Sequence, residues 1–135
     1  MRDALFVAFG GSLGALARYG VGLVFPHTPG KHFPVATLLV NLVGCLLIGM
    51  IGQLLQRFAA DASVKHQTGD LLITTLRQGM IVGFLGAYTT FSMFGAETYE
   101  LTEIGHWGLA FLNVAASAAA GVAAVALGQA LGRLC

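Results

Sequence analysis

Four apolar segments fill most of this chain, and each is long enough to cross a bilayer. They run from about residue 4 to 25, 35 to 55, 71 to 99 and 107 to 131. Crossing about 30 Å of hydrocarbon takes ~20 helical residues. Only 10% of the 135 residues are charged, whereas soluble domains carry about 25%. We therefore expect an all-α membrane protein with four transmembrane helices, in which no room remains for a soluble catalytic domain.

The third segment contains a stretch that a membrane helix tolerates poorly, Gly86-Ala-Tyr-Thr-Thr-Phe-Ser-Met-Phe94. Glycine loses backbone entropy in a helix, and threonine and serine hydroxyls compete for backbone hydrogen bonds. Inside a membrane, non-helical backbone survives only where protein buries it or where it lines a watery cavity. We therefore predict that the third helix is broken near its middle, and that the break belongs to an ion site or pathway.

An even number of spans places both termini on one side of the membrane. The basic residues expected on that side are Arg2, Arg57, Lys65, Arg77 and Arg133, with Arg18 and Lys31 on the other. The positive-inside rule then favours cytoplasmic termini, and the bias is weak enough to allow both orientations. Loops are expected at residues 26–34 and 59–70, and a very short third connection should make the last two spans a tight antiparallel pair.

Small residues predict where the helices approach each other closely. Gly10 and Gly14 form one small-xxx-small pair in the first span, and Gly128 and Gly132 form another in the fourth. Lipid provides little hydrophobic drive for helix association, so close packing of such residues supplies much of it. These faces predict packing and carry no information about function.

Polar residues inside the spans admit two interpretations. They are Asn41 in the second span, Thr89, Thr90 and Ser92 in the third, and Asn113 and Ser117 on one face of the fourth. Interhelical hydrogen bonds of such groups are worth about 0.6 to 2 kcal/mol each. The same amides and hydroxyls are donors that could replace water around an anion. Together with the break, they favour a lined pathway.

Two further side chains have a structural and a functional interpretation. Phe91 and Phe94 share a face if the helix resumes after Thr90; they either pack, or turn their positive ring edges toward an anion. Arg18, near the end of the first span, either snorkels to the headgroups or provides positive potential at a vestibule.

The titratable residues give little sign of other chemistry. Glu97, Glu100 and Glu103 lie at a span terminus, where we expect them to be solvated. The four histidines show no metal-ligand spacing. No nucleophile with a base is evident, so an enzyme is the least favoured class. The formal net charge of +1 argues against a nucleic-acid partner.

These residues together resemble a known family, the Fluc-type (CrcB) fluoride channels, over the whole length of the chain. Supporting motifs are Gly-Gly-x-x-Gly-Ala-x-x-Arg-Tyr from Gly10 to Tyr19, and Asn41 followed by Gly44. The specific motif is Thr-Thr-Phe-Ser-x-Phe, which ends at Phe94.

The resemblance implies an antiparallel dual-topology homodimer in the bacterial inner membrane. Two pores per dimer would let cytoplasmic fluoride leave passively and so lower its toxicity. The break would run from Gly86 through Thr89, and the main-chain carbonyls of these two residues, from both subunits, would bind a central structural Na⁺. Such carbonyls need a partner, and a desolvated cation needs oxygen ligands.

The resemblance also implies roles for side chains. The fluoride pathway would be lined by Asn41, Thr90, Phe91, Ser92, Phe94, Asn113 and Ser117, with Arg18 in the vestibule. Two positions depart from the family pattern. Met93 stands where a threonine is usual, and Asn113 where some members carry a tyrosine.

Two other functions remain as alternatives at this point. A small four-span multidrug exporter needs a membrane-embedded glutamate in its first span, where this chain has no acid beyond Asp3. A non-transporting accessory subunit would use the polar positions only as helix contacts, and it predicts no flux from the purified protein.

Overall fold

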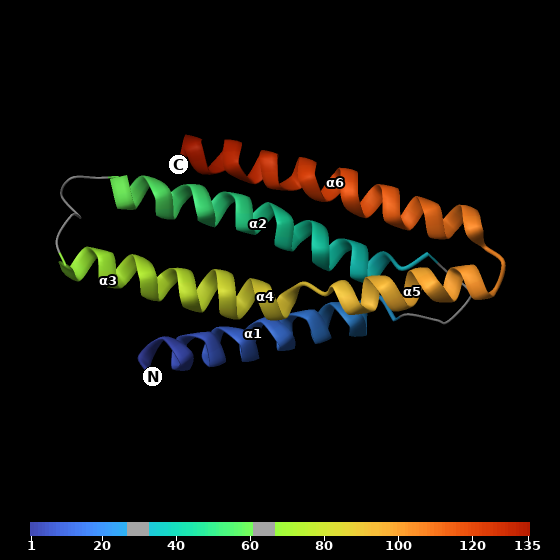
Figure 1. The fold of residues 1–135 in the computed structure, drawn as a ribbon, viewed down its shortest axis with the longest axis horizontal. Coiled ribbons are helices and arrows are strands. Elements are labelled where there is room, and N and C mark those ends of the chain that lie inside the picture. The colour runs from blue at the N-terminus through green and yellow to red at the C-terminus, as the bar shows by residue number, and fades with distance from the viewer. Residues whose placement is uncertain (27–32, 61–66) are drawn as a thin grey trace.

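The computed structural model describes residues 1–26, 33–60 and 67–135, and every regular element in that part of the chain is helical (Figure 1). In order, the elements are α1 (Arg2–Val24), α2 (Val35–Ala60), α3 (Gln67–Leu76), the π-helix η2 (Arg77–Leu85), α4 (Gly86–Tyr88), α5 (Phe91–Glu103) and α6 (Trp107–Leu134). Four helical stretches are long and apolar enough to cross a membrane: Arg2–Val24, Val35–Ala60, Leu71–Glu103 and Trp107–Leu134. The expected set of four long apolar helices is confirmed.

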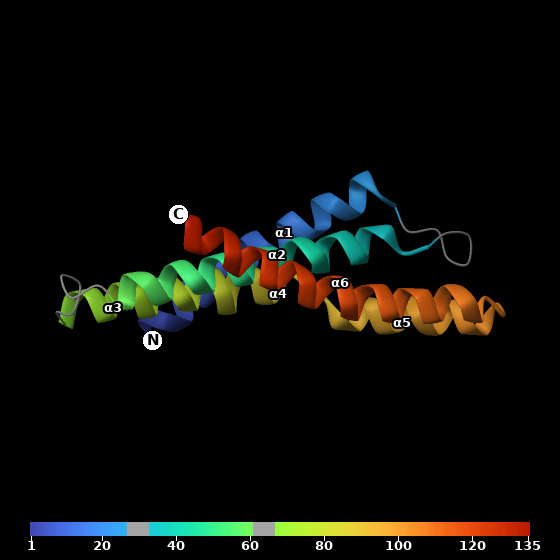
Figure 2. The same cartoon turned by 90° about the horizontal axis from the view of Figure 1, so that it is seen from above.

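The two termini lie at the same end of the bundle. The start of α1, the end of α2, the start of α3 and the end of α6 gather at the left of Figure 1. The first and third spans therefore run one way, and α2 and α6 run the other. Viewed from above, α1 crosses the bundle diagonally (Figure 2). The loop residues 27–32 and 61–66 lie outside the described part of the chain, and with them Lys31 and Lys65.

Close packing between α1 and the third span depends on glycine. A Cβ atom added to Gly10 would collide with the carbonyl oxygen of Gly79, and one added to Gly14 with the carbonyl oxygen of Phe84. The predicted small-residue face of α1 thus brings its backbone directly against η2. Such contact is how membrane helices gain packing energy that lipid does not supply.

The second close pair is α2 with α6. A Cβ atom on Gly49 would collide with the carbonyl oxygen of Val125, and one on Gly128 with the carbonyl oxygen of Leu46. We expected the last two spans to form a tight antiparallel pair. The structure corrects this, because α6 packs chiefly on α2 and meets the third span mainly through α5. Glycine on α2 and α6 allows the closer approach there.

Candidate ion site at the break of the third span

The third span is interrupted at two residues. Thr89 has φ −77° and ψ 159°, and Thr90 has φ −149° and ψ 116°, so both are extended between α4 and α5. We predicted a break from Gly86 through Thr89. The prediction was wrong in its position, because Gly86 to Tyr88 remain helical and the chain opens later, at Thr89 and Thr90.

Threonine side chains explain why the helix stops there. The backbone N–H and the hydroxyl of Thr89 both donate to the carbonyl oxygen of Leu85, at 3.0 and 2.9 Å. Thr90 is the N-cap of α5, and its hydroxyl oxygen accepts from the N–H of Met93 at 3.3 Å. A threonine at this position satisfies one of the backbone donors that the first turn of a helix leaves unpaired. The two threonines thus close one helix and open the next.

The break places two opposite helix ends side by side. The first half of the span ends with carbonyl groups that lack an intrahelical donor, and this end carries partial negative charge. The second half begins with free N–H groups, and this end carries partial positive charge. In a membrane, such discontinuous helices present a cation site and an anion site in close proximity.

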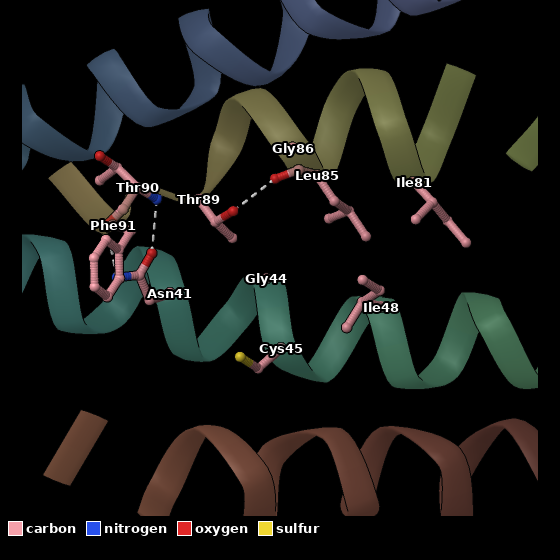
Figure 3. A pocket seen from close by; sticks show the side chains of 10 residues that line it. All are labelled: Asn41, Gly44, Cys45, Ile48, Ile81, Leu85, Gly86, Thr89, Thr90 and Phe91. Carbon is pink, nitrogen blue, oxygen red and sulfur yellow. Dashed lines mark hydrogen bonds between the residues drawn. The ribbon is translucent and has the colours of Figure 1, made fainter. Parts of the chain in front are cut away.

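Asn41 on α2 holds the break through both ends of its amide. Its Oδ1 accepts from the N–H of Thr90 at 2.9 Å, and its Nδ2 donates to the carbonyl oxygen of Thr90 at 3.1 Å (Figure 3). Gly44, one turn further along α2, faces Thr89 so closely that a Cβ there would collide with the threonine methyl. The side of α2 that faces the break is therefore shaped to fit it.

Arg18 reaches the break from α1. Its Nη1 donates to the carbonyl oxygen of Thr89 at 3.4 Å, and the contact is partly buried. A cation at a helix C-terminus stabilises the negative end of the helix dipole. Arg18 thus contacts the protein interior, and the interpretation that it only snorkels to the headgroups is not supported.

A pocket of about 330 Å³ lies against the break. It is lined by Asn41, Gly44, Cys45, Ile48, Ile81, Leu85, Gly86, Thr89, Thr90 and Phe91 (Figure 3). Its wall is mostly apolar, with the polar groups of Asn41, Thr89 and Thr90 gathered where the helix is open. Gly86 and Phe91 are exposed, and Phe91 is 83% exposed in the single chain.

A second, more polar pocket of about 470 Å³ lies on the α1 side of the break. Its polar lining comes from Arg18, Tyr19, Thr37, Thr90, Ser92 and Glu97. Thr90 lines both pockets, and its hydroxyl lies 3.2 Å from that of Ser92. Thr90 thus separates the two pockets.

The two phenylalanines of the motif share a face, as predicted. The ring centroids of Phe91 and Phe94 are 5.5 Å apart and the planes meet at 44°. Tilted pairs of aromatic rings at this separation are favourable.

Two polar residues of α6, Asn113 and Ser117, face the interior of the bundle. Asn113 is 1% exposed and its Nδ2 donates to the hydroxyl of Thr98 at 2.8 Å. That hydroxyl in turn donates to the carbonyl oxygen of Phe94 at 2.6 Å. Ser117, one turn along from Asn113, has a buried hydroxyl with no hydrogen-bond partner among the described residues. Asn113 therefore forms a hydrogen bond between α6 and α5, whereas the hydroxyl of Ser117 is available to donate to another group.

Glu97 differs from the sequence-based expectation. We expected a solvated carboxyl group, but Glu97 is only 4% exposed and its Oε1 accepts from the hydroxyl of Thr37 at 2.8 Å. The helix continues to Glu103, so Glu97 lies a turn and a half inside the span.

Thr37 and Thr98 are the residues that sequence reasoning missed. Their hydroxyl spacing gave no signal, because their partners lie 60 and 15 residues away.

The structure brings most of the predicted site residues to the break. Asn41, Gly86, Thr89, Thr90 and Phe91 surround one pocket, and Arg18 and Ser92 line the other. Phe94 adjoins Phe91. Asn113 and Ser117 form a separate group on α6, connected to Phe94 through Thr98.

Comparison with known proteins agrees with the resemblance seen in the sequence. A family model described as CrcB-like protein, Camphor Resistance (CrcB), matches residues 5–129. A relative named fluoride-specific ion channel FluC from Coxiella burnetii (strain CbuK_Q154) is 39% identical over 132 residues, covering 97% of this chain and 98% of the relative.

Two further relatives carry the same name, fluoride-specific ion channel FluC. One from Rhizobium johnstonii is 41% identical over 133 residues, covering 98% of each chain. One from Shewanella woodyi is 40% identical over 131 residues, covering 97% of this chain and 96% of the relative. Because both the family model and the relatives extend over nearly all of its length, the chain belongs to the CrcB/FluC family.

Proposed function

We propose that this chain is a fluoride-selective channel of the bacterial inner membrane, which lets cytoplasmic fluoride leave the cell passively and so lowers its toxicity. Membership of the CrcB/FluC family supports this directly. The observation that carries the proposal is the break at Thr89 and Thr90, where a carbonyl end and an N–H end meet beside a pocket in a membrane-spanning stretch. Neither an exporter with an acid in its first span nor an accessory subunit requires such a break.

The N–H end of the break supports an anion pathway. The start of α5 provides partial positive charge and free N–H donors. The hydroxyls of Thr90 and Ser92 add further donors there. Phe91 and Phe94 would complete the lining with ring edges, which are positive. Asn41 uses one N–H of its amide on Thr90, which leaves the other for an ion.

The approaches to this region are polar as well. Arg18 lines the larger pocket, where its charge would concentrate anions in a vestibule. On α6, the free hydroxyl of Ser117 and the buried amide of Asn113 would line the pathway beyond the phenylalanines. Selectivity over chloride would come from the width of this path and from donors spaced for a small anion.

Exposure at the break supports a second copy of the chain as partner. Gly86 and Phe91 are exposed, and the pocket beside them opens on non-helical backbone. Hydrocarbon cannot satisfy such backbone, so protein must cover it. A homodimer would place two breaks face to face and build two pores. The weak charge bias between the two sides supports antiparallel insertion in the lipid bilayer.

The residues present fit a structural Na⁺ at this face. The carbonyl of Gly86 lies in the last turn of α4, and that of Thr89, the C-cap residue, keeps a second lone pair beside its contact with Arg18, so two copies would provide four oxygens. Oxygen ligands at a negative helix end are the donor set that Na⁺ takes in discontinuous membrane helices. Bound there, Na⁺ would neutralise the converging carbonyl dipoles and join the two copies.

Fluoride efflux from proteoliposomes tests the function. Vesicles loaded with potassium fluoride and potassium chloride receive a K⁺ ionophore, and selective electrodes follow both anions. We expect fast fluoride release and negligible chloride release, against vesicles without protein as the control. Equal release of both anions, or no fluoride release from a folded dimer, would contradict the proposal.

A further inference from the structure

We propose that Asn41 sets the affinity of the cation site, by drawing the N–H of Thr90 away from the carbonyl of Gly86. The inference rests on the proposed function, because it concerns the Na⁺ that would bind between two copies. It gives Asn41 a positioning role toward the cation, distinct from any contact with the anion.

Helix geometry defines which hydrogen bond is missing. In a continuous helix the N–H of residue 90 donates to the carbonyl of residue 86. Gly86 has helical angles, φ −62° and ψ −34°, so its carbonyl points along the axis toward the break. The N–H of Thr90 instead donates to Oδ1 of Asn41 at 2.9 Å.

Neighbouring residues show that this exchange is local. One position earlier, the N–H of Thr89 still donates to the carbonyl of Leu85 at 3.0 Å, as a helix requires. The change therefore begins with the one N–H that Asn41 accepts. Nδ2 of the same amide donates to the Thr90 carbonyl at 3.1 Å, which fixes the rotation of that residue.

The consequence for a cation follows from competition. A carbonyl that accepts an N–H shares its negative potential with that donor, whereas a free carbonyl offers all of it to a cation. Without the Asn41 amide, the partner that a continuous helix would give the Thr90 N–H is the Gly86 carbonyl, four residues earlier. Each of the two breaks of a dimer would then offer Na⁺ one carbonyl oxygen weakened by an N–H donor.

Three variants separate this role from a general packing role. Asn41→Leu removes both ends of the amide at similar size. Asn41→Asp keeps an oxygen that accepts from Thr90 and removes the donor. Asn113→Leu is the matched control, because it deletes a buried amide of α6, which donates to Thr98 and not to the break.

The measurement is the melting temperature of the purified dimer as Na⁺ replaces a large organic cation at constant ionic strength. A ligand that binds only the folded state raises the melting temperature with its concentration. We expect the Na⁺ midpoint of Asn41→Leu to rise at least about tenfold. We expect Asn41→Asp, which keeps the acceptor for the Thr90 N–H, to bind Na⁺ no more weakly than the unchanged chain, and Asn113→Leu to keep its midpoint. Fluoride efflux at saturating Na⁺ is recorded in parallel.

An unchanged midpoint in Asn41→Leu would overturn the inference, and so would an equal loss in Asn41→Asp. Failure of Asn41→Leu to assemble moves the test to Asn41→Ala, which removes the amide without adding bulk. Fluoride efflux with no Na⁺ response in the unchanged chain would overturn the cation role alone, whereas absence of selective fluoride efflux would overturn the proposed function.

Discussion

The two halves of the third span are held by different kinds of contact. Before the break, the backbone of η2 and α4 lies directly against Gly10 and Gly14 of α1, with no space for a Cβ between them. After the break, α5 is held through side-chain hydrogen bonds, from Thr37 to Glu97 and from Asn113 to Thr98. One half uses glycine and van der Waals contact, and the other uses polar groups.

The difference separates an anchor, by which we mean η2 and α4 packed on α1, from α5, which lines the proposed ion pathway. Close backbone contact leaves no space between α1 and the first half, whereas the second half presents hydroxyl and carboxyl groups beside a polar pocket. Polar groups within a span are costly and concentrate where ions pass. The break at Thr89 and Thr90 lies at the boundary between the two halves.

The largest expected effect is on the anchor. In Gly14→Val, the new Cβ meets the carbonyl oxygen of Phe84, which cannot move without shifting the backbone of the third span. Overpacking of this kind costs about 1 to 3 kcal/mol, and more where backbone must move. We expect little folded dimer on size-exclusion chromatography. Gly20→Val, on the same helix with nothing within 4 Å of its Cβ, is the control, and equal yields would contradict the packing.

The next largest effect is expected on the rate of fluoride efflux, in a variant of Phe91 that still folds. Phe91 is 83% exposed in the single chain, so Phe91→Ile removes little packing from its own subunit. If the ring edge faces the anion, fluoride efflux should fall about tenfold or more, which corresponds to about 1.4 kcal/mol in the barrier. Phe111→Ile on α6, at a residue 75% exposed, is the matched control. An unchanged rate of efflux from a folded Phe91→Ile dimer would show that the Phe91 ring does not contact the permeating anion.

A smaller effect is expected on the stability of the polar half. Thr37→Val deletes the hydroxyl that donates to the buried Glu97. Removing a hydrogen bond to a buried carboxyl group costs about 1 to 3 kcal/mol. We expect a lower melting temperature and a normal elution volume. Thr102→Val, whose exposed hydroxyl donates to the Tyr99 carbonyl of its own helix, should lower the melting temperature less; the reverse order would contradict the assigned contact.

The smallest effect is expected at the contact between α5 and α6. Thr98→Val removes the hydroxyl that accepts from Asn113 and donates to the Phe94 carbonyl. Hydrogen bonds between membrane helices average about 0.6 kcal/mol and reach about 1.7 kcal/mol. Combining Thr98→Val with Asn113→Leu should cost less than the sum of the two single changes. Strict additivity in melting experiments would show that the two side chains are not coupled.

Sequence reasoning predicted the features that depend on local composition. The four long apolar helices, the glycine faces of the first and fourth spans, and an interruption in the third span all follow from hydropathy and from residues such as Gly14 and Thr90. Local chemistry also accounts for Phe91 and Phe94 sharing a face.

Features that depend on contacts between distant segments could not be predicted from hydropathy or local residue types. The break at Thr89 and Thr90 depends on Asn41, on another helix, as well as on the two threonines, because Asn41 accepts the Thr90 N–H. Glu97 is buried, and Thr37, 60 residues away, donates to it. Backbone carbonyls such as that of Gly86 have no side-chain signature, so their proposed role as ligands came from the family resemblance alone.

The reversal potential of the purified protein in a planar bilayer tests the central claim most directly, with opposed gradients of fluoride and chloride. The account predicts a potential that follows the fluoride gradient and is unaffected when chloride is replaced, because the break and its pathway would pass only fluoride. A potential that follows chloride, or no current from a protein shown to be a folded dimer, would contradict it.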